Sequence, residues 1–239
     1  MTVIALWAHP RSLSTAFLRM MIERGDVTVV HEPLVTLVDT GEVALPDGAG
    51  GTVVARSAAE VFDRLRELAS DRPVFFKDTV EYRYGYLFEH PERIADITHT
   101  FIVRDPRPAI ASLHAMKPTA ARHEFGYEHL YDIFALVRAV TGRAPAVVDA
   151  DRLLADPAAV VAAYCAAVGL PFVAEALSWR PGDRAEWSRT RQWHRAASAS
   201  SGFQAPASRY TATVDDDALL RSHYDYHRPF YDELVKHAI

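Results

Sequence analysis

A short stretch near the N-terminus combines one arginine with three hydroxyl side chains. Residues 9–15 read HPRSLST, so Arg11 is followed by Ser12, Ser14 and Thr15. A guanidinium group and hydroxyl groups are donors that suit an anion, and a phosphate above all. The sequence therefore predicts an anion site in this stretch. Capping of the following helix by Ser14 or Thr15 is an alternative role that is compatible with such a site.

The segments on either side would position these donors. Val3–Ala8 is an apolar run that predicts a strand, and Thr15 to about Arg24 has helical spacing. A loop that leaves a strand and enters a helix brings free backbone N–H groups and the positive helix end to one point. The stretch lacks the glycines and the lysine of the ATP-binding motif G-x-x-x-x-G-K-[ST], which makes nucleotide triphosphate hydrolysis the less favoured interpretation.

A second arginine stands where another predicted strand ends. Arg104 directly follows the apolar segment Thr98–Val103, and the next residues, Asp105 and Pro106, lead into a helical segment that carries Ser112. In open α/β folds, ligands bind at the carboxyl edge of the strands. A guanidinium with a hydroxyl suits a second, separate phosphate. The alternative is an Arg104–Asp105 turn with Ser112 packed in the core.

Short apolar segments alternate with helical segments along most of the chain. Further strands are predicted at 27–30, 73–76 and 145–148, further helices at 57–70, 107–115, 125–141, 157–168 and about 215–238, and a surface loop at 40–51. Strands that are apolar on both faces and separated by helices indicate a parallel sheet covered on both sides. We therefore expect one α/β domain over residues 1–239, with about five parallel strands and a closing loop and helix in 178–239.

The composition sets limits on the function. The chain has 239 residues, 49% of them hydrophobic, and a formal net charge of −5, which excludes wholesale disorder and disfavours broad nucleic-acid binding. Cys165 is the single cysteine, so neither an intrachain disulfide nor a cysteine zinc site can form. No stretch has the apolar length of a membrane span or the pattern of a signal peptide. We expect a cytoplasmic protein without a metal.

Taken together and in this order, the two arginine motifs resemble the sulfotransferase family. Pro10–Thr15 matches the loop that in this family holds the 5′-phosphosulfate of 3′-phosphoadenylyl sulfate (PAPS), and Arg104-Asp105-Pro106 with Ser112 matches the segment that holds its 3′-phosphate. The resemblance covers roughly residues 2–170 and implies a P-loop NTPase-like fold. The PRSLST stretch is closest to a bacterial and plant branch of the family. The donor-binding residues that it implies are Arg11, Ser12, Leu13, Ser14, Thr15, Arg104 and Ser112.

Weaker matches extend the resemblance. FFKD (75–78) is similar to the family strand whose lysine lies near the transferring sulfuryl group, which implies Lys77. Residues 193–203 look like a variant of the loop that closes over the nucleotide. They lack the R-K-G run of many members, so Arg195, Ser201 and Gly202 are implied less strongly as donor-binding residues.

The general base departs from the family pattern. Many members have a histidine two residues after the strand lysine, where this chain has Thr79. Glu32 and Glu81 are slightly favoured as base over His31, with Asp78 as a further candidate; we interpret Arg11 and Lys77 as the cations that stabilise charge on the leaving oxygen. Without a base, the acceptor would have to be ionised already, or the protein would bind PAPS without turning it over.

The resemblance implies sulfuryl transfer from PAPS to a hydroxyl or amine of a small-molecule acceptor, leaving 3′,5′-ADP. No metal, nucleic acid or membrane is expected as a partner, and a homodimer is left open. Two other classes remain. One is an ATP- and magnesium-dependent kinase of P-loop type, which the missing glycine–lysine pair disfavours. The other is a non-catalytic nucleotide-binding protein of the same fold.

Overall fold

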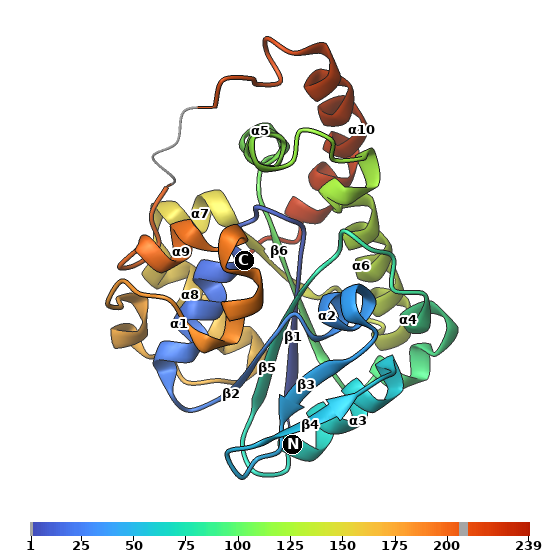
Figure 1. Cartoon of the computed structure of the whole chain (residues 1–239), viewed down its shortest axis with the longest axis vertical. Coiled ribbons are helices and arrows are strands. Elements are labelled where there is room, and N and C mark those ends of the chain that lie inside the picture. The colour runs from blue at the N-terminus through green and yellow to red at the C-terminus, as the bar shows by residue number, and fades with distance from the viewer. Residues whose placement is uncertain (1, 206–209) are drawn as a thin grey trace.

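The structure is a computed structural model that describes residues 2–205 and 210–239 (Figure 1). The strands are β1 (Val3–Ala8), β2 (Thr28–His31), β3 (Val43–Pro46), β4 (Thr52–Ala55), β5 (Val74–Thr79), β6 (Thr98–Val103) and β7 (Ala146–Asp149). The α-helices are α1 (Ser14–Arg24), α2 (Pro33–Thr40), α3 (Ala58–Leu68), α4 (Gly85–Glu89), α5 (Pro106–Met116), α6 (Tyr127–Thr141), α7 (Ala150–Ala155), α8 (Pro157–Val168), α9 (Arg195–Ala199) and α10 (Ala218–Val235). Short 3₁₀ segments are η1 (Pro91–Ile94), η2 (Arg122–Phe125), η3 (Ala174–Leu177) and η4 (Ala185–Trp193).

Five strands form one parallel sheet in the order β2-β5-β1-β6-β7. The central strand β1 pairs with β5 from Val3↔Val74 to Ala8↔Thr79, and with β6 on its other side. This confirms the predicted single α/β domain with a five-stranded parallel sheet. Because all five strands run the same way, the segments after β1, β2, β5 and β6 emerge at one edge of the sheet.

Side chains of alternate residues enter two separate cores, one on each face of the sheet. Val3, Ala5 and Trp7 of β1 pack with the core that α3, α5, α6 and α10 cover. Ile4 and Leu6 point to the other face, where α1 and α8 lie (Figure 1). Both faces are therefore buried, which explains why the strands are apolar throughout rather than alternating.

The predicted surface loop at 40–51 is wrong. This stretch contains β3 and leads through a tight turn into β4, which pairs with it antiparallel. Val43 and Leu45 are buried while the residues between and after them are exposed, a period-two pattern too short to be recognised. In the turn, the carboxylate of Asp47 accepts hydrogen bonds from the backbone N–H groups of Ala49 and Gly51, both at 2.8 Å. Helix α2, which precedes this hairpin, was also not predicted from the sequence.

The predicted closing region 178–239 has two structural parts. Helix α9 contacts α1, and η4 contacts β2, so this part lies over the carboxyl edge of the sheet. Helix α10 instead packs against α5 and α6, on the face away from α1 (Figure 1). Residues 206–209, between the two parts, lie outside the described residues. Among the helices that the structure describes, none combines the length and apolarity needed to cross a membrane.

Candidate active site

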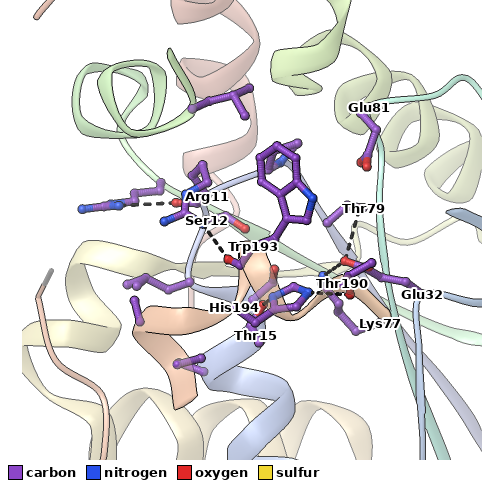
Figure 2. A pocket seen from close by; sticks show the side chains of 18 of the residues that line it. Arg11, Ser12, Thr15, Glu32, Lys77, Thr79, Glu81, Thr190, Trp193 and His194 are labelled. Atoms are coloured by element: carbon purple, nitrogen blue, oxygen red, sulfur yellow. Dashed lines mark hydrogen bonds and ion pairs between the residues drawn. The ribbon is translucent and has the colours of Figure 1, made fainter. Parts of the chain in front are cut away.

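A pocket of about 440 Å³ opens at the carboxyl edge of the sheet. Its walls come from residues 10–16, from the ends of β2 and β5, from Arg104 and from the C-terminal half of α5. Residues between 190 and 205 close one side (Figure 2). The pocket therefore lies where the sequence motifs were expected to meet, and its lining residues come from segments that are far apart in the sequence.

The loop after β1 has an unusual backbone. Arg11 and Leu13 have φ angles of 67° and 69°, a left-handed conformation that non-glycine residues seldom adopt and that clusters at functional sites. Leu13 is the N-cap of α1 and makes no side-chain capping bond. The predicted capping by Ser14 or Thr15 is wrong, because both residues are already helical. The first backbone N–H groups of α1 thus have no side-chain cap and stay available to an anion in the pocket.

Both predicted arginines converge on this loop. Arg11 Nε donates to Ser112 Oγ at 2.9 Å, and its Nη1 donates to the backbone oxygen of Trp193 at 3.0 Å. Arg104 Nη1 donates to the backbone oxygen of Arg11 at 3.3 Å. Burial, helped by the positive charge of Arg104, lowers the pKa of Arg11. Two partly desolvated guanidinium groups in one pocket make a strong site for negative charge. We call this the arginine end of the pocket.

Two buried donors at the arginine end have no partner. Within residues 2–205 and 210–239, Ser12 Oγ and Arg104 Nε make no hydrogen bond, although Ser12 has no exposed surface and Arg104 is 7% exposed. Buried polar groups are almost always paired, and leaving one unpaired costs about 1–3 kcal/mol. A phosphate or sulfate oxygen would satisfy both atoms. The residues present at this end therefore fit an anionic group.

Arg104 is held at its backbone by two aromatic rings. His9 Nε2 accepts a hydrogen bond from the Arg104 backbone N–H at 3.0 Å, and the Tyr127 hydroxyl donates to the Arg104 carbonyl oxygen at 2.9 Å. The two rings stack with centroids 4.0 Å apart. Burial lowers the pKa of His9 to about 3, so the ring is neutral and can accept this bond. His9 was quoted in the loop but its role was missed, since nothing in its local spacing indicates a partner 95 residues away.

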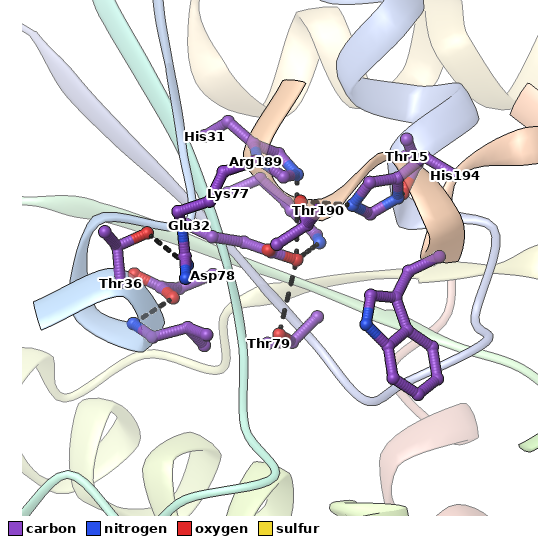
Figure 3. A network of polar contacts seen from close by, with 12 residues as sticks. Thr15, His31, Glu32, Thr36, Lys77, Asp78, Thr79, Arg189, Thr190 and His194 are labelled. Atoms are coloured by element: carbon purple, nitrogen blue, oxygen red, sulfur yellow. Dashed lines mark hydrogen bonds and ion pairs between the residues drawn. The ribbon is translucent and has the colours of Figure 1, made fainter. Parts of the chain in front are cut away.

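Glu32 and Lys77 form the centre of the pocket. Lys77 Nζ donates to Glu32 Oε1 in a buried ion pair, and the Thr79 hydroxyl lies 3.4 Å from the same oxygen (Figure 3). Glu32 has a φ of 47° at the N-cap of α2, which is again a strained backbone at a lining residue. Burial acts to raise the pKa of Glu32, but the charge and hydrogen bond of Lys77, together with His31 and His194, outweigh burial and lower this pKa to about 2. Glu32 is therefore ionised.

Asp78, which follows Lys77 in β5, has a structural role. Its carboxylate is buried and accepts hydrogen bonds from the backbone N–H groups of Leu34 at 2.7 Å and Val35 at 3.0 Å. These are orphan donors in the first turn of α2, whose own N-cap Glu32 directs its side chain elsewhere. Asp78 thus caps α2 from a neighbouring strand and does not line the pocket. The geometry does not favour its predicted role as base.

Glu81 is the second carboxylate that faces the pocket. It follows β5, and Figure 2 shows its carboxylate directed from there toward the space beside Trp193. Its Oε2 atom is buried and makes no hydrogen bond within the protein. Burial, assisted by the negative charge of Glu32, raises the pKa of Glu81. The two lining glutamates have their pKa values pushed in opposite directions, a pattern typical of acid–base pairs.

His31, Glu32 and His194 present ligand atoms within 4.8 Å of one another. His31 Nε2 is buried, has no hydrogen-bond partner and lies 3.6 Å from Glu32 Oε1. Burial lowers the pKa of His31 to about 4, which makes it a weak base, and it does not line the pocket. The carboxylate of the group already has the ammonium of Lys77 as its cation, so these contacts describe an ion pair rather than a metal centre.

The family model described as "Sulfotransferase domain" matches residues 1–238. The chain belongs to the sulfotransferase family. Three solved structures share the fold: the sulfotransferase domain from the Synechococcus PCC 7002 olefin synthase has a TM-score of 0.59 at 15% identity and covers 95% of this chain and 94% of its own. The sulfotransferase domain from the curacin biosynthetic pathway has a TM-score of 0.52 at 15% identity, covering 84% and 83%. The sulfotransferase from Alicyclobacillus acidocaldarius has a TM-score of 0.52 at 12% identity, and the match covers 99% of this chain and 95% of that structure.

Two curated plant proteins are also similar in sequence. Branched-chain-amino-acid aminotransferase-like proteins 2 and 1 of Arabidopsis thaliana are each 29% identical, over 212 and 246 residues. The matches cover 86% and 99% of this chain but 37% and 42% of the relatives. The chain thus spans less than half the length of these two relatives. The likeness concerns one region of longer proteins, so their names carry no activity over to this chain.

The C-terminal segment of the chain contributes to the site differently from the prediction. Gly202 lines the pocket, but Arg195 and Ser201 are exposed and lie outside the lining. Trp193 and His194 of this segment also line the site; Trp193 was one of the tryptophans expected to wall an acceptor pocket, whereas His194 was not singled out from the sequence. His194 Nδ1 lies 3.0 Å from Thr15 Oγ1, and its Nε2 lies 3.0 Å from Thr190 Oγ1. Trp193 and His194 directly precede Arg195 in the sequence, and this position beside an expected site residue was the signal that could have indicated them.

Proposed function

We propose that this protein transfers a sulfuryl group from PAPS to a hydroxyl or amine of a small-molecule acceptor. The observation that carries the proposal is the combination, in one pocket, of unpaired anion donors with a buried lysine–glutamate pair. Ser12 and Arg104 supply the unpaired donors, and Lys77 and Glu32 form the pair. Ser12 and Arg104 suit the binding of an anionic sulfuryl donor. The Lys77–Glu32 pair suits a displacement reaction at the sulfuryl group of a donor bound beside it.

The arginine end would hold the phosphates of the donor. Arg11, Ser12 and the start of α1, with Leu13, Ser14 and Thr15, surround the position proposed for the 5′-phosphosulfate. Arg104 and Ser112 are proposed for the 3′-phosphate, since they approach Arg11 from the side of α5. The bond between Arg11 and Ser112 joins the two phosphate positions.

Transfer is an in-line displacement at sulfur. A bond forms between the acceptor oxygen or nitrogen and sulfur, while the bond between sulfur and the bridging phosphate oxygen breaks. The acceptor proton passes to the carboxylate of Glu32, and the electron pair of the broken bond stays on the leaving phosphate of 3′,5′-ADP. Arg11 and Lys77 stabilise that developing charge, as cations do in phosphoryl transfer.

Lys77 couples these two tasks. While its ammonium is paired with Glu32, the pKa of that carboxylate is held at about 2 and the carboxylate is a weak base. A shift of the ammonium toward the bridging oxygen of the donor would remove this effect and raise the basicity of Glu32 as charge develops. Glu81, which lines the same pocket, is the second candidate base.

Labelled sulfuryl transfer tests the proposal. Incubation with labelled PAPS and a library of small alcohols and amines is expected to label at least one acceptor. The variant Glu32→Gln should reduce that rate at least about 100-fold, because general base catalysis contributes about 10²–10⁴-fold. Glu89→Gln, at an exposed carboxylate outside the pocket, is the matched control and should retain the rate. An equal rate in the Glu32 variant would remove its proposed role.

A thermal-shift comparison separates the two other classes. A sulfotransferase is expected to be stabilised by 3′,5′-ADP and not by ATP with magnesium, whereas a P-loop kinase would show the opposite. A non-catalytic nucleotide-binding protein would respond to 3′,5′-ADP yet transfer no label. Stabilisation by ATP with magnesium alone would overturn the proposed donor.

A further inference from the structure

The pocket has a second end with the opposite electrostatic character. Asp39, Glu81, Tyr82 and Glu124 line it, and we call this group the carboxylate end. Figure 2 shows Arg11 and Glu81 on opposite sides of the Trp193 indole. An anionic donor is attracted to the arginine end, so the carboxylate end faces the space left for the acceptor.

Most of the charges at this end already have partners. Lys117 donates to Glu124. Asp39 accepts a hydrogen bond from the Tyr82 hydroxyl at 3.0 Å, and an Arg189 nitrogen lies 3.5 Å from its other oxygen. At Glu81, in contrast, the buried Oε2 atom has no partner within the protein. Glu81 is therefore the carboxylate of this end that has no ion-pair partner among the residues that the structure describes.

The surroundings of Glu81 are negative and aromatic. The carboxylate of Asp39, through its hydrogen bond, raises the pKa of Tyr82 to about 12, with burial and the charges of Glu81 and Glu124 acting in the same direction. Tyr82 is 38% exposed and Trp193 is half-buried, so both rings can offer a face to the pocket. Aromatic faces beside a carboxylate are the usual surroundings of a bound ammonium group.

Resting on the proposed sulfuryl transfer, the geometry points to a small amino alcohol as the acceptor, with its ammonium at Glu81, Tyr82 and Trp193 and its hydroxyl at Glu32. The ammonium would supply the positive charge that Glu81 lacks. The hydroxyl would donate its proton to the carboxylate beside Lys77. The same molecule would thus bridge the two lining glutamates.

The chain between the hydroxyl and the ammonium must be short. Thr79 Oγ1 lies 3.4 Å from Glu32 Oε1. The Thr79 side chain also hydrogen-bonds with Glu81, which lowers the pKa of that carboxylate and so partly opposes the effect of burial. One threonine side chain therefore lies within reach of both carboxylates. An amino alcohol with few carbons between its two groups matches this separation, and an extended acceptor with a remote cation does not.

Binding measurements with a charged and an uncharged probe of the same shape test this inference. Choline and its carbon isostere, in which a carbon atom replaces the quaternary nitrogen, are titrated into the protein saturated with 3′,5′-ADP. We expect choline to bind at least about tenfold more tightly than the isostere, since a partly desolvated ammonium gains both charge pairing and cation–π contact. In Glu81→Gln this preference should disappear, whereas the control Glu89→Gln should retain it.

The possible outcomes separate this inference from the function it rests on. Equal binding of the two probes, or a preference that survives Glu81→Gln, overturns the amino-alcohol acceptor. Binding of an uncharged sugar in place of choline also overturns it, because Glu81 would then recognise hydroxyl groups. Failure of 3′,5′-ADP to bind would instead count against the proposed donor. The two probes can then still be compared on the protein alone, and the wild-type comparison stands even if the Glu81 variant does not fold.

Discussion

The two ends of the pocket are assembled in different ways. At the arginine end, seven consecutive lining residues, 10–16, lie between the central strand β1 and helix α1, and Arg104 and Ser112 flank them from β6 and α5. At the carboxylate end, no two of the four residues except Glu81 and Tyr82 are adjacent in the sequence, and α2, η2 and the segment after β5 each contribute.

The two ends therefore differ in how strongly the fold constrains their residues. The arginine end depends on a parallel sheet and on the first turn of one helix, which are properties of the whole family fold. The carboxylate end depends on loops and helix ends, which change more readily without loss of the sheet. We therefore expect substitutions at the arginine end and at the central pair to affect every acceptor alike, and substitutions at Glu81 to change the choice of acceptor.

The largest effect is expected at the centre, where the two ends meet. Lys77→Met removes the cation that pairs with Glu32 and that would stabilise the leaving oxygen. Removing one preorganised stabilising group costs about 10²–10³-fold in kcat. Single-turnover transfer from labelled PAPS measures this, with the affinity for 3′,5′-ADP as a parallel readout. A variant that lost donor affinity while its kcat stayed unchanged would place Lys77 at the arginine end instead.

The next effect tests the arginine end alone. Arg104→Ala should weaken binding of 3′,5′-ADP about 10- to 100-fold, because a charge-assisted hydrogen bond contributes about 1.5–3 kcal/mol. Arg107→Ala is the matched control, since Arg107 is only partly buried and pairs with Asp215 at 2.7 Å outside the pocket lining. Isothermal titration measures both variants. Equal affinity in the wild type and in Arg104→Ala would remove Arg104 from the 3′-phosphate position.

A smaller effect is expected from the support behind Glu32. Asp78→Asn replaces the carboxylate that accepts two backbone N–H groups of α2, and should lower the free energy of unfolding by about 2 kcal/mol in urea. The substitution should also reduce kcat, because Glu32 is the N-cap of α2 and a shift of this helix would displace the Glu32 carboxylate. Asp156→Ala removes the N-cap side chain of α8, outside the pocket lining, and should lower stability while leaving kcat unchanged. Equal kcat in the two variants would show that Asp78 supports only the fold.

The smallest effect concerns the dependence of stability on pH at the arginine end. Burial lowers the pKa of His9 to about 3 from an ordinary 6.5. Between these pH values His9 is protonated in the unfolded chain but neutral in the folded protein. The free energy of unfolding should therefore fall as the pH falls from about 6.5 toward 3, by up to about 1.4 kcal/mol per pH unit for this histidine. His31 and His194, whose pKa values are also lowered, add to the same slope. In His9→Gln the slope, measured by urea unfolding between pH 7 and 5, should be shallower; an unchanged slope would contradict the role of His9.

The sequence predicted the arginine end better than the carboxylate end for a physical reason. A strand, a loop and a helix in succession constrain where Arg11, Ser12 and Thr15 can lie, and a strand end constrains Arg104. The fold class and all five sheet strands followed from the same local patterns. Four base candidates could not be ranked, because ranking them needs the orientation of side chains at the sheet edge.

The long-range contacts explain what else was missed. His194 reaches Thr15 across 179 positions, and His9 reaches Arg104 across 95. Neither contact has a local signature. The hairpin β3–β4 was missed because each strand has only four residues, which is too short for a clear alternation. Arg195 and Ser201 were assigned from a motif match alone, and both are exposed and lie outside the pocket lining.

The central claim is that the arginine end recognises a nucleotide with a phosphate at both the 5′ and the 3′ position. Isothermal titration of the wild-type protein with 3′,5′-ADP and with 5′-AMP tests it most directly, because the two ligands differ only in the 3′-phosphate. We predict that 3′,5′-ADP binds at least about tenfold more tightly, through Arg104. Equal affinities, or no binding of 3′,5′-ADP at all, would contradict the account.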